Sequence, residues 1–110
     1  MHTILVFLAL LLSFSVHAED MEHSTITSCA YQGGTAREIQ TIRQTEGHDW
    51  LEFEKQINQI YRQGQGRQDL LAIAKVVYQQ PLTATPASAY DNAFSLCVKR
   101  TKEAALKSAS

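Results

Sequence analysis

The chain opens with an unbroken apolar run that changes abruptly to acidic residues. Residues 4–12 are all apolar, and Val16-His17-Ala18 then places tolerated side chains at the positions that a signal peptidase reads. Glu19 and Asp20 follow directly. The alternative, an uncleaved membrane anchor, would need about 20 apolar residues, more than this stretch offers. We therefore interpret residues 1–18 as a cleaved signal peptide, which predicts a periplasmic or secreted protein without membrane insertion of the mature chain.

Downstream of the apolar run the pattern predicts an arm and a first helix. Residues 19–28 are polar and without period, so we expect a flexible acidic arm. From residue 29 onward apolar residues recur at helical spacing, with Gly47 as a left-handed end to the first helix. The glycine pair at 33–34 leaves two alternatives open: the helix begins only at Thr35, or the glycines let another helix pack closely.

The next stretch predicts a short amphipathic helix. Asp49 is a good N-cap, with Glu52 as its capping-box partner, and Gly64-Gln65-Gly66 is expected to stop the helix. Its apolar stripe consists of Trp50, Phe53, Ile57, Ile60 and Tyr61.

Two further helices complete the predicted domain, which spans residues 29–107. Asp69 is expected to cap a third helix that Pro81 ends, and Thr85-Pro86 reads as the N-cap and first residue of a fourth. No segment alternates with period two for long. The fold class is therefore all-α: a small irregular four-helix bundle.

The chain contains two cysteines, Cys29 and Cys97. In an oxidising compartment they would form a disulfide that closes the small bundle, with two free thiols or an intermolecular bridge as alternatives. On the chain-entropy model such a bridge stabilises the domain by roughly 4 kcal/mol. We expect it to make the first and last helices neighbours.

Charge and motifs exclude several classes of function. The net charge of −1 gives no long-range attraction to nucleic acid. No nucleophile motif or phosphate loop is present, and His48 beside Glu46 or Asp49 lacks the spacing of a metal site. We therefore expect no enzyme, no catalytic residue, no cofactor and no bound metal.

The candidate partner-contact residues are apolar residues outside an evident core position. Two lie at the start of the second helix, where the alternative is that the tryptophan is simply core, and three lie in the stiff, proline-containing loop at 79–86. They are Trp50, Leu51, Pro81, Leu82 and Pro86.

Several residues resemble the shared frame of small exported two-cysteine helical proteins of proteobacteria, which are mostly uncharacterised. They are Cys29, Arg43-Gln44 with Gly47, Ala74 with Tyr78 and Pro81, and Cys97. In general plan the chain also resembles the HdeA-type acid chaperones and the Rap1a/Tai immunity proteins. These resemblances imply a helical, disulfide-closed periplasmic protein, and neither better-known class supplies site residues for this chain.

Two functional hypotheses follow. The first is a small periplasmic or secreted binding protein, of the inhibitor or immunity type, whose partner is another protein. The second is a periplasmic acid-stress chaperone that loosens at low pH and exposes its apolar stripe. A homodimer remains open under either hypothesis.

Overall fold

The computed structural model describes the backbone of residues 2–109 and the side chains of residues 23–108. This part of the chain is all-α, with α1 (His2–Glu46), α2 (Trp50–Ile60), α3 (Gln65–Gln79) and α4 (Pro86–Ala109). The expected irregular four-helix bundle is confirmed. The signal peptide predicted at 1–18 and the first part of the predicted arm, residues 19–22, lie outside the residues with described side chains.

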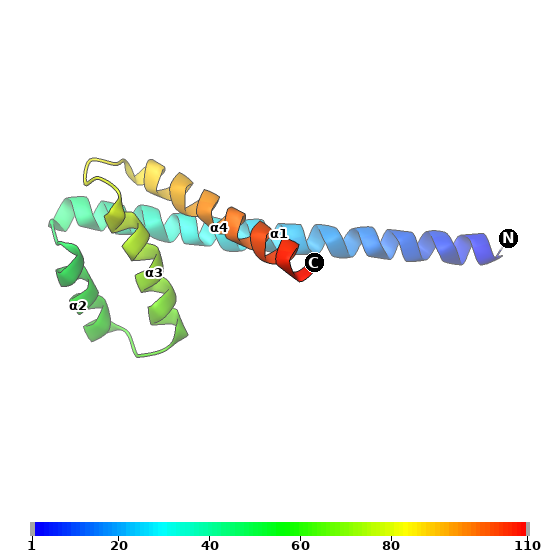
Figure 1. The fold of residues 1–110 in the computed structure, drawn as a ribbon, viewed down its shortest axis with the longest axis horizontal. Coiled ribbons are helices and arrows are strands. Elements are labelled where there is room, and N and C mark those ends of the chain that lie inside the picture. Colours follow the sequence, from blue (N-terminus) through cyan, green and yellow to red (C-terminus); the bar gives the residue numbers. More distant parts are fainter. Residues whose placement is uncertain (1, 110) are drawn as a thin grey trace.

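The helices form a pair with a hairpin attached to it. α1 and α4 run side by side in opposite directions, and α3 packs against both (Figure 1). α2 packs against α3. The connection between α3 and α4 therefore lies beside the C-terminal end of α1.

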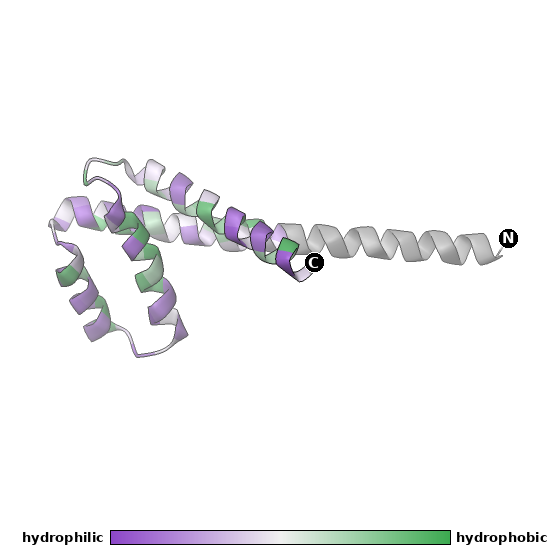
Figure 2. Cartoon of the chain, viewed as in Figure 1, coloured by the Kyte–Doolittle hydropathy of each residue, from purple (hydrophilic) through white to green (hydrophobic). Residues whose placement is uncertain are grey.

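A compact apolar core joins the four helices. Figure 2 shows hydrophilic and hydrophobic residues mixed along each described helix, as expected of amphipathic helices. Each helix contributes two residues to the buried cluster. They are Ala36, Ile39, Phe53, Ile57, Ala74, Val77, Ala89 and Ala93.

The disulfide predicted between Cys29 and Cys97 is present. Both residues are buried, and the bond links positions 68 residues apart, with a Cα–Cα distance of 5.4 Å. It ties α1 to the middle of α4, so the first and last helices are neighbours, as expected.

Three helix ends follow local sequence signals. The Asp49 carboxylate accepts a hydrogen bond from the Glu52 amide at 2.9 Å, and the Thr85 hydroxyl accepts one from the Ser88 amide at 3.0 Å. These bonds confirm both predicted N-caps. Gly47 ends α1 with φ of 72°, the left-handed conformation that glycine adopts without strain.

The boundary between α2 and α3 differs from the prediction. α2 ends at Ile60, before the glycines, and α3 begins at Gln65 with Gly64 as its N-cap, so Asp69 does not cap α3. The Asp69 carboxylate instead accepts a hydrogen bond from the Gln65 side chain at 2.7 Å, one turn earlier in the same helix. Ile60 and Tyr61, expected on the apolar stripe, are exposed because α2 ends there.

The backbone at residues 23–28 is also helical, where the sequence predicted a flexible arm. The Thr27 hydroxyl donates to the His23 carbonyl at 3.0 Å, and Ile26 lines a groove together with side chains of α4. The neighbouring α4 thus gives this polar segment a surface to pack on. Within the described residues, no helix is long and apolar enough to span a bilayer.

Gly33 of α1 faces the Tyr90 ring of α4. A Cβ at Gly33 would lie 2.9 Å from the Tyr90 ring, whereas a Cβ at Gly34 would meet no atom within 4 Å. Of the two alternatives left open by the sequence, α1 therefore continues through the glycines, and Gly33 allows the aromatic ring of α4 to pack against its backbone.

Candidate functional site

The α3–α4 loop, residues 80–85, is an uncharged surface loop at the end of the molecule where α1 finishes (Figure 1). The Ala84 amide donates to the Pro81 carbonyl at 3.0 Å and closes a turn. Leu82 lies in this turn with 55% of its surface exposed. Pro81 is exposed as well, whereas Pro86 is half-buried as the first residue of α4.

Two glutamines of α1 hold the backbone of this loop. Gln40 is completely buried, and its side-chain amide donates to the carbonyls of Leu82 and Ala84 at 3.1 and 2.8 Å. Gln44, one turn later, donates to the same two carbonyls at 3.0 and 2.8 Å. Each carbonyl thus accepts two hydrogen bonds, the full capacity of its lone pairs. The turn is therefore anchored to α1 on both sides of residue 83.

Arg43 anchors the point where α3 enters the loop. Its guanidinium donates to the carbonyls of Val77 and Gln80 at 3.3 and 3.0 Å, and to the Gln40 side-chain oxygen at 3.3 Å. Carbonyls at a helix C-terminus lack intrahelical partners and carry partial negative charge, so a cation is favourable there. The guanidinium also lies 4.7 Å from the centre of the Tyr78 ring. Arg43 therefore stabilises the end of α3 and the start of the loop together.

Tyr78 connects the base of the loop to the α1–α2 connection. Its hydroxyl donates to the His48 carbonyl at 3.2 Å, and its ring contacts Trp50 and Phe53 at centroid distances of 5.6 and 5.4 Å. Burial raises the pKa of the Tyr78 phenol above its ordinary value of 10.0, Asp49 adds to the rise, and Arg43 opposes it. The phenol therefore keeps its proton and its hydrogen bond to high pH.

The structure divides the predicted contact residues between two surfaces. Pro81, Leu82 and Pro86 lie in or beside the anchored loop. Leu51 is 71% exposed and projects from the first turn of α2. Trp50 is half-buried in the aromatic cluster with Phe53 and Tyr78, which is the core position that the alternative interpretation expected.

Gln40 is a site residue that the sequence reasoning missed. The available signal was its position: it follows Ile39 and lies four residues after Ala36, which places a polar side chain on an apolar helical stripe. The same loop also brings together Arg43, Gln44, Tyr78 and Pro81. In this structure they hold or form the α3–α4 loop.

The described residues give little support for chemistry at His48. Its Nε2 atom lies 3.2 Å from a Glu46 carboxylate oxygen and 3.3 Å from the Gln56 side-chain amide. Among the residues with described side chains, no group of three His, Cys, Asp or Glu residues could hold a metal ion. His48 therefore pairs with Glu46 at the surface.

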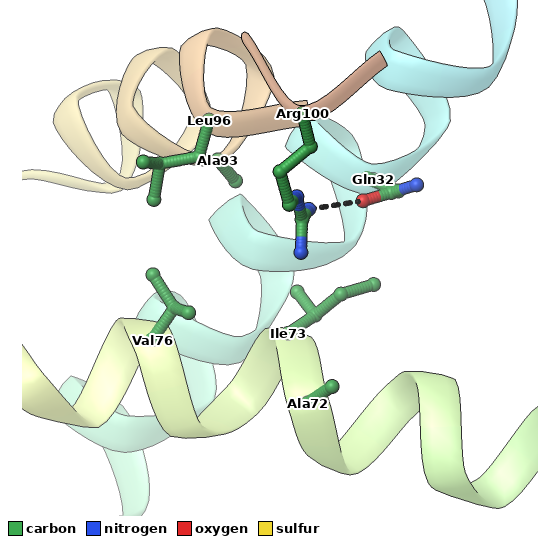
Figure 3. Close-up of a pocket in the computed structure, with 7 residues that line it drawn as sticks. All are labelled: Gln32, Ala72, Ile73, Val76, Ala93, Leu96 and Arg100. Carbon is green, nitrogen blue, oxygen red and sulfur yellow. Dashed lines mark hydrogen bonds between the residues drawn. The ribbon is translucent and has the colours of Figure 1, made fainter. Parts of the chain in front are cut away.

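A small cavity lies between α1, α3 and α4 (Figure 3). Its volume is about 60 Å³, and Ile73 and Val76 of α3 face Leu96 of α4 across it. The Arg100 guanidinium donates to the Gln32 side-chain oxygen at 3.3 Å along its edge. Sites for organic ligands are typically about 300–1,000 Å³, so this cavity has room only for a few water molecules.

The anchored loop thus combines three properties: it is uncharged, it exposes the apolar side chain of Leu82, and its carbonyls are hydrogen-bonded to α1. Compared with protein-family models, curated proteins and solved structures, the chain gives no significant match.

Proposed function

We propose that this chain is a small exported, non-enzymatic binding protein of the inhibitor or immunity type, and that it inserts the α3–α4 loop into a cleft of a partner protein. One observation carries the proposal. Gln40, Gln44 and Arg43 fix the loop backbone through five hydrogen bonds while Leu82 remains exposed.

A fixed loop favours binding because it has little conformational freedom left to lose. Ordering a flexible interface opposes association, and a preorganised loop avoids most of that penalty. Leu82 then supplies an apolar anchor for a pocket. Residues 79–90 carry no charge, so binding through this loop depends little on salt concentration.

The compartment supports a partner outside the cytoplasm. Disulfides persist in oxidising environments, and the bond between Cys29 and Cys97 fits the periplasm or the extracellular space that the signal peptide predicts. A protein partner in that space, such as a secreted or periplasmic hydrolase, has the kind of cleft that a stiff loop can occupy.

The test is affinity capture from an extract of periplasmic and secreted proteins of the source organism with the mature chain immobilised. The informative variant is Leu82→Asp, and the matched control is Leu51→Asp, which places the same charge at an even more exposed leucine, in α2. We expect the wild type and Leu51→Asp to capture one protein in stoichiometric amounts, and Leu82→Asp to lose it. Failure to recover any stoichiometric protein, or equal capture by Leu82→Asp, would contradict the proposal.

A second variant separates loop order from loop contact. Gln40→Leu leaves every exposed side chain of the loop unchanged and removes two of its anchoring bonds. We expect its affinity for the captured partner to fall by about tenfold through a higher entropic penalty. Unchanged affinity would show that the anchoring has no part in binding.

The alternative function is that of an acid-stress chaperone. A chaperone of that kind would unfold partly at about pH 2–3, bind a hydrophobic dye and protect client proteins from aggregation. Gln40, the buried polar side chain among the described residues, does not titrate. No contact described above therefore favours this second function.

A further inference from the structure

A second exposed apolar surface runs along α1 and α4, away from the α3–α4 loop. Two adjoining hollows, of about 480 and 400 Å³, share Phe94, Val98 and Lys102. We call the combined surface the α1–α4 groove. Its principal residues are Ile26, Phe94, Val98, Lys102, Ala105 and Leu106.

The α1–α4 groove is the side of the helix pair that α3 does not cover. Ala93 and Leu96 line the cavity that α3 shares with α4 (Figure 3), whereas Phe94 and Val98 line the groove. α2 packs against α3 and does not reach the pair. Ile26 and Leu106 are 49% and 71% exposed at the groove.

The shape of the α1–α4 groove suits a helix. Two antiparallel helices in contact leave a furrow between them, and a third helix packs into such a furrow in helical bundles. Phe94, Val98 and Ala105 recur at positions i, i+4 and i+11 of α4, the spacing of a continuous helical stripe. The groove therefore offers a stripe for the apolar face of an amphipathic helix.

The charge around the α1–α4 groove selects the occupant. The charged residues that line the groove are Lys99, Lys102 and Glu103, so the groove has one more basic than acidic side chain, whereas the chain as a whole has one more acidic than basic residue. Lys99 and Lys102 are exposed and line the groove. A second copy placed on this surface would bring like charges together, whereas an acidic occupant would meet opposite charge.

We infer that the α1–α4 groove binds an acidic amphipathic helix of a partner protein. The helix lays its apolar face on Phe94 and Val98 while its carboxylates meet Lys99 and Lys102. This interaction uses other residues than the α3–α4 loop and does not depend on the function proposed for that loop.

The test measures binding of fluorescent synthetic peptides to the mature, disulfide-bonded protein. The probe is an amphipathic helical peptide with leucine along one face and glutamate along the other; its counterpart has lysine in place of glutamate. We expect the glutamate peptide to bind at least about tenfold more tightly than the lysine peptide, and added salt to weaken it. Equal binding of the two peptides, or no binding, would overturn the inference.

Paired charge reversals locate the interaction. The double variant Lys99→Glu/Lys102→Glu should bind the glutamate peptide about tenfold more weakly. The control Lys55→Glu/Lys75→Glu, on α2 and α3, should bind it with unchanged affinity. Vesicles of phosphatidylglycerol and phosphatidylcholine in equal parts test whether the groove binds lipid instead. Binding to these vesicles without a preference for the glutamate peptide would assign the α1–α4 groove to lipid and overturn the inference. Self-association that the peptide reverses would assign it to a second copy, with the same consequence.

Discussion

At the scale of single residues, Gln40 combines complete burial with full use of its side-chain amide. Its nitrogen serves two loop carbonyls, and its oxygen accepts from Arg43. A buried polar group that keeps its partners stabilises one conformation, whereas loss of a partner leaves groups desolvated and unpaired. The loop geometry therefore depends on this residue more than on any exposed neighbour.

Gln40→Leu should lower the free energy of unfolding by about 1–3 kcal/mol. Gln44→Leu is the matched control, because Gln44 donates to the same carbonyls from an exposed position. Water can replace its bonds, so we expect a loss below about 1 kcal/mol. Urea unfolding followed by circular dichroism measures both, and equal losses would contradict the role assigned to burial.

Tyr78 gives the protein a dependence on alkaline pH. Because burial raises the pKa of the folded phenol above 10.0, the folded state binds this proton more tightly than the unfolded state. The stabilising contribution is complete below the unfolded pKa and is lost as the pH rises toward the folded pKa. As the pH rises above about 10, the wild type should lose stability relative to Tyr78→Phe. Urea unfolding across this range tests the difference, and a constant gap would contradict it.

At the scale of the helices, the seam between α1 and α4 depends on the absence of a side chain at Gly33. The Tyr90 ring that lies against it is stacked on Phe94, with centroids 6.1 Å apart, and the Arg37 guanidinium lies 5.6 Å from its centre. A ring that contacts both Phe94 and Arg37 cannot move aside freely, so Gly33 has little tolerance for a methyl group.

Gly33→Ala and Gly34→Ala should therefore have opposite effects. At Gly34 a methyl group meets no atom within 4 Å, and the better helix propensity of alanine should stabilise the protein by about 0.5–1 kcal/mol. At Gly33 we expect a net loss of about 1–2 kcal/mol from overpacking. Thermal unfolding measures both variants. The loss at Gly33 should vanish in a Tyr90→Ala background, and its persistence there would show that the ring is not the cause.

Local signals in the sequence were sufficient for most of the fold. Asp49 and Thr85 are N-caps because their side-chain oxygens meet amides three residues later, an interaction encoded within one turn. The start of α3 was missed because Asp69 resembles a cap, while Gly64, which takes that place, makes no side-chain bond. Distinguishing the two requires knowledge of the backbone.

The candidate site was predicted only in part, for a related reason. Leu82 and the two prolines mark an unusual loop in the sequence itself. The residues that anchor this loop lie about 40 positions earlier, as Gln40 and Leu82 show with a separation of 42. Single-sequence periodicity contains no information about such a contact, because it reports spacing along one element.

At the scale of the whole molecule, one covalent bond unites the helix pair. The link between Cys29 and Cys97 spans 68 residues and includes most of the domain, so it restricts the unfolded chain strongly. A small domain buries limited apolar surface and has little stability in reserve. The bundle is therefore expected to depend on its oxidised state.

Cys29→Ala/Cys97→Ala should lower the free energy of unfolding by roughly 4 kcal/mol. Reductant should produce a similar loss in the wild type and none in the double variant, which separates the disulfide from side effects of the reagent. Urea unfolding with and without reductant measures these differences. Titratable thiols in the purified native protein, or an unchanged transition on reduction, would contradict the expectation.

The hairpin of α2 and α3 lies inside the segment that the disulfide closes. Its turn, residues 61–64, joins two helices of which α2 leans on α3 rather than on the helix pair. A peptidase that cleaves the backbone once in this turn would produce two fragments that stay joined by the disulfide. Such a cleaved molecule would still contain α1, α4, the anchored loop and the groove. The disulfide would therefore preserve both surfaces after a cleavage that would separate the fragments of a chain without it.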